Sequence, residues 1–262
     1  SCVPIRVADC GYNAEQIVKA VQKAAGQGVE VLCLPELCVT GYTCEDLFFQ
    51  PALLNGVLDA LQVILKETAD LSVLFAVGAP LRHNGKLYNC AIVIQHGKIL
   101  GVVPKTHLPN YNEFYEQRHF DSAPEETDAI HLFGQEIPFG TKLLFASQEH
   151  DALKVAVEIC EDLWAPVSPG TAHALAGATI VMNLSASDEI IGKAAYRKDL
   201  VSAQSARLLC GYLYADAGEG ESTTDLVFAG HHLIAENGTV LAQSKPFANE
   251  DILVEIDVER LS

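Results

Sequence analysis

The chain has 262 residues, a formal net charge of −17, 49% hydrophobic residues and 19% charged residues. This composition supplies enough apolar side chain for a large core and excludes a disordered chain, while the length fits one large domain or two small ones. The acidic balance argues against nucleic acid and anionic membrane surfaces as partners. Because we find no signal-peptide pattern and no apolar run of roughly 18 residues, we expect a soluble, cytoplasmic protein.

Helices and strands alternate along the first half of the chain. Asn13 and Gln16 stand in a capping-box relation and Gly28 is a stop signal, so the pattern predicts a helix over 13–28, followed by a buried strand over 29–35. The pattern then predicts a helix over 52–70 and strands over 72–79, 87–95 and 99–104. The segment 107–138 has no clean period, and we expect a long loop whose part 121–128 is solvated.

The second half continues the alternation and ends in β structure. We expect a strand over 153–160, a helix over 171–176, a strand over 179–184, a helix over 192–210 and a β-rich stretch over 211–258. A turn at Glu236-Asn-Gly238 predicts a hairpin in that stretch. Together these elements predict an α/β fold built as a layered sandwich.

Three apolar runs each end in or beside one reactive residue: Glu36, Lys105 and Cys160. Open α/β folds place ligand sites at strand ends. A carboxylate, an ammonium group and a thiol gathered there would supply a base, an oxyanion stabiliser and a nucleophile. The alternative is that each charge only marks where a core strand meets water. Three such ends, two of them preceded by Pro, favour the catalytic interpretation.

The eight cysteines mostly lie inside apolar strand or helix patterns, and we expect buried free thiols that behave as small hydrophobic side chains. Only Cys160 combines a strand end with acidic flanks, which predicts that it alone is the catalytic thiol. The sequence has no Cys-x-x-Cys pair and no His-Glu-x-x-His motif. We therefore expect no metal site.

Several motifs resemble one family over essentially the whole chain. They are Pro35-Glu36-Leu37 with Thr40-Gly41-Tyr42, Pro104-Lys105 with the run from Leu108 to Glu116, Glu158-Ile-Cys160-Glu161-Asp162-Leu-Trp164, Asn183-Leu-Ser-Ala-Ser187, Gly192-Lys193 and Gly220-Glu-Ser-Thr-Thr-Asp225. The chain resembles the nitrilase, or carbon–nitrogen hydrolase, superfamily and, more narrowly, the glutaminase domains of glutamine-dependent NAD synthetases. The resemblance implies an αββα sandwich that hydrolyses the side-chain amide of glutamine and passes ammonia to a synthetase domain, which amidates activated deamido-NAD.

The same resemblance implies roles for individual residues. Cys160 would be the nucleophile, Glu36 the general base, and Lys105 the oxyanion stabiliser together with a backbone N–H just after Cys160. Glu113 would be a second glutamate that holds Lys105 and the substrate amide; its alternative is an exposed loop acid. By resemblance, the residues lining the glutamine pocket would be Tyr111, Glu161 and Ser187. For Ser187 the alternative is a helix cap before Asp188.

The sequence departs from the family pattern in two places. It contains no Ser-Gly-Gly-x-Asp-Ser-like loop for ATP pyrophosphate, so the synthetase domain is absent from residues 1–262. We expect no cofactor for the glutaminase domain, with ATP and Mg used only by the synthetase domain. The family also begins with a core strand before the segment matching Val3–Asp9, and its lack would leave unpaired ladder groups; we therefore expect that the sequence is an excerpt of a longer chain.

Two other functions stay open at this stage. One is a free-standing amidase, nitrilase or carbamoylase of the same superfamily. The other is a non-catalytic oligomerisation or regulatory domain, which would lack one of the three reactive residues or have a closed pocket. We also expect a homo-oligomer.

Overall fold

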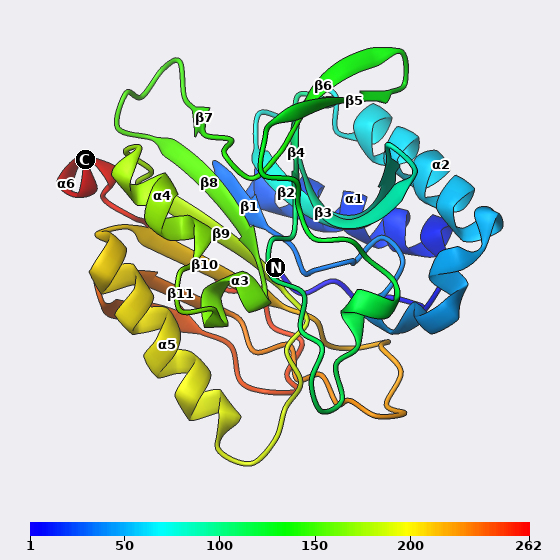
Figure 1. Cartoon of the computed structure of the whole chain (residues 1–262). Helices are drawn as coiled ribbons and strands as arrows, with labels where there is room; N and C mark the ends of the chain where they lie inside the picture. The colour runs from blue at the N-terminus through cyan, green and yellow to red at the C-terminus, as the bar shows by residue number, and fades with distance from the viewer.

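The computed structural model describes all residues, 1–262, and contains two six-stranded sheets packed face to face with helices on both outer surfaces (Figure 1). Sheet A has the strand order β1-β2-β3-β4-β6-β5 and sheet B the order β12-β11-β10-β9-β8-β7. The strands of sheet A are β1 (Val31–Cys33), β2 (Leu74–His83), β3 (Lys86–Gln95), β4 (Lys98–Pro104), β5 (Asp128–Leu132) and β6 (Gln135–Phe139). Those of sheet B are β7 (Phe145–Ala146), β8 (Lys154–Ile159), β9 (Ile180–Ser185), β10 (Gly211–Asp216), β11 (Leu233–Glu236) and β12 (Thr239–Gln243).

The helices form the outer layers of the predicted αββα sandwich. Sheet A is covered by α1 (Cys10–Gly26) and α2 (Pro51–Glu67), and sheet B by α3 (Glu161–Trp164), α4 (Pro169–Leu175) and α5 (Lys193–Leu208) (Figure 1). Two 3₁₀ segments, η1 (Tyr42–Phe49) and η2 (Glu116–Arg118), and the short α6 (Val258–Leu261) complete the list. No single helix is long and apolar enough to cross a membrane; η1 and α2 meet that test together, by length and composition only, across a bend of 118°.

Three apolar clusters hold the layers together. The largest, of 38 buried residues, joins α1 and α2 to the outer face of sheet A; a second, of 15, lies between the sheets; a third, of 9, joins sheet B to its helices. The helices contribute through one apolar face each; in α1 this face includes Ile17, Val21 and Ala24. The site described below therefore stands on a buried framework from both sheets.

The start of the first helix differs from the prediction. α1 begins at Cys10, three residues before Asn13, and the side chain of Asp9 caps it by accepting from Tyr12 N at 3.1 Å. Asn13 is buried; its amide nitrogen donates to the carbonyl oxygens of Arg6 and Val39 at 2.9 and 3.0 Å. The predicted capping box is wrong because the Asn13 side chain binds neighbouring backbone from inside the helix.

The predicted loop over 107–138 contains a hairpin at its end. β5 and β6 pair through a two-residue turn at Phe133 and Gly134, both with positive φ (53° and 75°). Their alternate residues Ile130 and Ile137 are buried. The hairpin over 233–243 was predicted, and its turn residues Asn237 and Gly238 adopt the positive φ that such turns require.

β1 pairs with β2 on one side only. On the other side lies a groove of about 860 Å³, lined by β1 and the segment 251–258 among others. The segment 251–258 alternates between exposed and half-buried residues and pairs with no strand. On the same side of β1, the Ser1 ammonium group donates to Cys33 O at 2.8 Å. β1 is therefore an edge strand of sheet A.

Candidate active site

Glu36 lies in a tight turn directly after β1. Its side chain is buried, and its backbone N–H donates to Ser185 O at 3.2 Å, which ties the end of β1 to β9 in the other sheet. The turn passes so close to β2 that a Cβ on Gly78 would lie 2.2 Å from Leu37 N. Only glycine fits at that position, and its absence of a side chain lets the turn present the Glu36 carboxylate to the space between the sheets.

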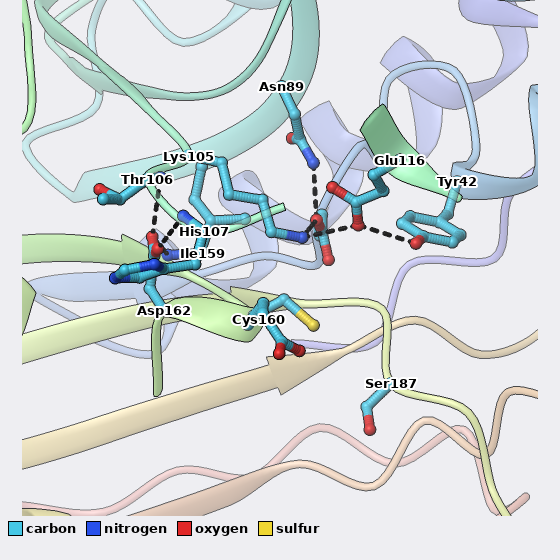
Figure 2. A network of polar contacts seen from close by, with 12 residues as sticks. Tyr42, Asn89, Lys105, Thr106, His107, Glu116, Ile159, Cys160, Asp162 and Ser187 are labelled. Atoms are coloured by element: carbon cyan, nitrogen blue, oxygen red, sulfur yellow. Dashed lines mark hydrogen bonds and ion pairs between the residues drawn. The ribbon is translucent and has the colours of Figure 1, made fainter. Parts of the chain in front are cut away.

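Lys105 follows β4 and is fully buried between two carboxylates (Figure 2). Its Nζ donates to Glu36 Oε1 and to Glu116 Oε1, each at 2.7 Å. Asn89 Nδ2 donates to Glu36 Oε1 at 2.6 Å, and the Tyr42 hydroxyl donates to Glu116 Oε1 at 2.8 Å. The second oxygens, Glu36 Oε2 and Glu116 Oε2, are buried without a hydrogen-bond partner. The cluster thus holds one cation firmly and keeps two acceptor atoms free.

The second glutamate beside Lys105 is Glu116, and the prediction that Glu113 makes this contact is wrong. Glu113 is half-buried and makes no hydrogen bond or ion pair. A turn in which Phe114 N donates to Tyr111 O at 2.9 Å reverses the chain, and Glu116 N donates back to Pro109 O at 3.1 Å. This reversal carries Glu113 past the Lys105 ammonium group and places Glu116 against it.

Cys160 stands at the junction of β8 and α3 in a sharp turn. Its φ and ψ are 43° and −99°, values that a non-glycine residue adopts only under constraint. The Cys160 N–H donates to Leu184 O at 2.9 Å and to Asn183 Oδ1 at 3.2 Å, which fixes the turn against β9. In Figure 2 the thiol faces the region between the Lys105 ammonium group and Ser187. The strand end therefore presents the sulfur to the carboxylate and ammonium cluster.

Burial and mutual charge set the protonation of these groups. Burial alone would lower the pKa of Lys105, but the negative charges of Glu116 and Glu36 more than offset it, and the net pKa lies well above its ordinary value. Burial, partly opposed by Lys105, raises the pKa of Glu116 to about 6. Burial and the negative charge of Glu36 raise the pKa of the Cys160 thiol well above its ordinary value. The resting site thus holds a charged ammonium group and a protonated thiol that needs a base.

Two of the predicted substrate contacts pair with each other. The Tyr111 hydroxyl donates to the Glu161 carboxylate, at 3.0 and 3.1 Å from its two oxygens, and Tyr111 is 51% exposed. The two residues come from opposite sheets, since Tyr111 follows β4 and Glu161 begins α3. They form an outer polar contact on the Cys160 side of the site.

Ser187 lies on the loop after β9 and is buried. Its backbone N–H donates to Asp216 Oδ1 at 2.8 Å, and its hydroxyl accepts from Arg197 at 3.2 Å. The alternative of a helix cap is wrong, because the next helix, α5, begins at Lys193 after Gly192. Contact of Ser187 with a substrate stays a prediction.

Sequence reasoning missed Glu116, Asn89, Tyr42 and the buried Asp162. Glu116, Tyr42 and Asp162 lie inside the family motifs, but the sequence pattern does not show which of several acids in a loop faces inward. Asn89 offered a usable signal, because a polar amide inside an otherwise apolar strand must find a partner when it is buried.

The remaining predictions about cysteine and metal concern the whole chain. All eight cysteines are free, as predicted, and all but Cys2 are buried. The structure contains no group of three or more His, Cys, Asp or Glu side chains placed to hold a metal ion.

Comparison with known proteins places this geometry in a family. The carbon–nitrogen hydrolase family model matches residues 3–262. A glutamine-dependent NAD(+) synthetase of Mycobacterium tuberculosis is 45% identical over 241 residues, which are 92% of this chain and 36% of that protein. The corresponding protein of Aquifex aeolicus is 30% identical over 253 residues, 96% of this chain and 41% of that protein.

Solved structures agree with the sequence matches. A glutamine-dependent NAD(+) synthetase from Cytophaga hutchinsonii superposes with a TM-score of 0.81 at 33% identity, covering 92% of this chain and 39% of that one. An amidase from Nesterenkonia shares the fold, with a TM-score of 0.73 at 19% identity over 94% of this chain and 85% of that one. The chain spans less than half the length of its synthetase relatives. With the family model matched from residue 3 to residue 262, the chain belongs to the carbon–nitrogen hydrolase family.

Proposed function

We propose that this domain hydrolyses the side-chain amide of glutamine to glutamate and ammonia through a thioester on Cys160. The observation that carries the proposal is the state of Glu36: one carboxylate oxygen is bound by Lys105 and Asn89, and the other is buried without a partner. A fixed carboxylate with one free oxygen is suited to accept and return a proton at the same place.

The first half of the reaction forms the thioester. Glu36 Oε2 takes the proton of the Cys160 thiol, and the sulfur attacks the amide carbon. The carbonyl oxygen becomes an oxyanion, which the Lys105 ammonium group stabilises. The backbone N–H of Glu161, the residue directly after Cys160, is expected to share this charge. Glu36 then gives its proton to the amide nitrogen, the C–N bond breaks, and ammonia leaves.

The second half regenerates the thiol. A water molecule gives a proton to Glu36 and attacks the thioester carbon, the C–S bond breaks, and the sulfur receives the proton back from Glu36. Glutamine and water thus give glutamate and ammonia, and Lys105 keeps its proton throughout. Glu116 keeps the ammonium group oriented, since its Oε1 is fixed from the other side by the Tyr42 hydroxyl.

The glutamine specificity and the fate of the ammonia rest on the relatives. The synthetases named above are glutamine-dependent, and they are more than twice as long as this chain. We propose that the ammonia formed here is used by a synthetase domain that amidates deamido-NAD, with ATP and Mg bound by that domain alone. The predicted contacts Tyr111, Glu161 and Ser187 would hold the amino and carboxylate ends of glutamine.

Ammonia release from glutamine by the purified chain tests the proposal. We expect glutamate and ammonia in equal amounts, loss of both in Cys160→Ser, and no NAD from deamido-NAD and ATP. Short aliphatic amides, nitriles and carbamoyl compounds serve as competing substrates. Fast turnover of one of them with glutamine inert would move the assignment to a free-standing amidase, nitrilase or carbamoylase, and a folded chain inert toward all of them would favour a non-catalytic domain.

A further inference from the structure

Asp162 is a buried carboxylate whose side chain the proposed reaction does not use. It lies in the short helix α3, two residues after Cys160, and only 1% of its surface is exposed. No lysine, arginine or histidine forms an ion pair with it, and its bonded partners are backbone N–H groups. A buried carboxylate without a cation is costly to keep, so its hydrogen bonds call for an explanation.

Those hydrogen bonds join the two sheets at the site. Asp162 Oδ1 accepts from His107 N at 2.8 Å, and Oδ2 accepts from Ile159 N at 3.0 Å, with a longer contact of 3.5 Å from Thr106 N (Figure 2). Thr106 and His107 directly follow Lys105 in the segment after β4, whereas Ile159 directly precedes Cys160 at the end of β8. One carboxylate therefore connects the backbone beside the cation to the backbone beside the thiol.

This connection matters because the reactive groups come from different sheets. Lys105 belongs to sheet A and Cys160 to sheet B, and the layer between the sheets is an apolar cluster without a strand ladder. Apolar packing alone is non-directional and fixes distance less sharply than hydrogen bonds do. The Glu36 N–H to Ser185 O bond ties the base to sheet B, and Asp162 supplies the corresponding tie for Lys105.

We propose that Asp162 is a positioning residue that sets the distance between the Cys160 thiol and the Lys105 ammonium group, and that its hydrogen bonds act on the thioester-forming step. The proposal rests on the proposed function, since it assigns Asp162 to the same reaction. Asp162→Asn keeps the side-chain shape but replaces one acceptor oxygen by an NH₂ group, which faces a backbone N–H and cannot accept from it.

The test measures labelling of Cys160 by 6-diazo-5-oxo-norleucine, a glutamine-mimicking electrophile, in the whole chain. It gives a maximal rate and a half-saturating concentration, and it needs neither glutamine turnover nor a synthetase domain. For Asp162→Asn we expect the maximal rate to fall about 10- to 100-fold, because a displacement of about 1 Å in a preformed site has that effect. The half-saturating concentration should stay within about threefold of the wild-type value, since the groups that bind the compound are unchanged.

Thr179→Val is the matched control. The Thr179 hydroxyl accepts from Lys154 N at 3.1 Å and donates to Ala152 O at 2.6 Å, so it ties backbone at the opposite end of β8, away from Cys160. We expect Thr179→Val to lower the Tm and leave the labelling rate per folded molecule unchanged. Labelling of folded Asp162→Asn at the wild-type rate, or a change confined to the half-saturating concentration, would overturn the proposal. Failure of the wild-type protein to be labelled would instead count against the proposed function.

If Asp162→Asn does not fold, the proposal is tested with Asp162→Ser and with hydrogen exchange in the wild-type protein. Asp162→Ser removes the bridge with a smaller side chain and should show the same loss of maximal labelling rate. In the wild-type protein, amide hydrogen exchange should find His107 and Ile159 protected at least about 100-fold and opening with the same free energy, because one carboxylate holds both. Exchange of either amide at the rate of an unprotected loop would show that the bridge does not form and would refute the proposal.

Discussion

Replacement of Glu116 by Gln isolates the charge that the structure places beside Lys105. The ion pair has an N–O distance of 2.7 Å, for which Coulomb attraction at an effective dielectric of about 20 is about 6 kcal/mol as an upper bound. Desolvation of the carboxylate cancels much of this, and the Gln amide oxygen can still accept from Nζ. Glu36 remains as a second partner. We therefore expect Glu116→Gln to lose about 2 to 4 kcal/mol of transition-state stabilisation, which lowers kcat/KM about 30- to 1,000-fold.

The assay compares ammonia release from glutamine with thermal unfolding for the same protein. Glu116→Gln also removes a buried charge, so its free energy of unfolding should change by no more than about 2 kcal/mol. Glu113→Gln is the matched control: the substitution is identical, the position is three residues away, and the side chain makes no hydrogen bond. Its turnover should be near normal. A slow Glu113→Gln beside a normal Glu116→Gln would refute this account and restore the role first predicted for Glu113.

The remaining predictions concern the thiol, the pH dependence and the turn that carries the base. Mass spectrometry after treatment with a glutamine-mimicking electrophile should find one adduct, on Cys160, because its thiol faces the cluster of Glu36 and Lys105, whereas the buried Cys38 thiol donates to the backbone oxygen of Gly78. An adduct on Cys38 with Cys160 unmodified would contradict the assignment. Turnover should fall as the pH drops through about 6, because protonation of Glu116 removes an anion from Lys105, and this acid limb should be missing from the pH profile of Glu116→Gln. Gly78→Ala should lower the free energy of unfolding by more than about 3 kcal/mol in urea titrations, because its Cβ would clash with Leu37 N at 2.2 Å. The control is Gly26→Ala in helix α1, where an added Cβ meets nothing within 4 Å and the free energy of unfolding should stay unchanged. Equal effects of the two substitutions would contradict the steric argument.

The sequence predicts helices and strands correctly where hydrophobic periodicity and turn-forming residues indicate the same element. The strands that end near Lys105 and Cys160 were predicted within a residue or two of their observed bounds, because buried strands appear in the sequence as continuous apolar runs. The start of α1 was misplaced because Asn13 suits a cap by type, and its use as an internal backbone ligand depends on the distant Val39. The hairpin over 128–139 was missed because exposed polar residues and Pro138 interrupt its short alternation.

The structure brings the predicted strand-end residues together, whereas the residue predicted from the loop lies away from Lys105. Strand ends have fixed directions, so Glu36, Lys105 and Cys160 could be expected to meet. The choice between Glu113 and Glu116 depends on a turn at 111–114, whose reversal is a tertiary event. Asn89 and Asp162 form hydrogen bonds with residues more than fifty positions away, and local sequence periodicity does not predict such contacts.

The buried cluster contains two carboxylates and one ammonium group, and this charge imbalance affects the release of an anionic product. With both carboxylates ionised, Glu36 and Glu116 carry two negative charges against the single positive charge of Lys105. A neutral amide can enter this environment without adding charge, and ammonia can leave in the same way. In the proposed reaction the acid left behind ionises beside two anions and one cation, so it joins a cluster that already has a net negative charge in surroundings that screen repulsion poorly. For the proposed reaction we therefore expect electrostatic repulsion to favour product release and to disfavour the reverse condensation of acid with ammonia.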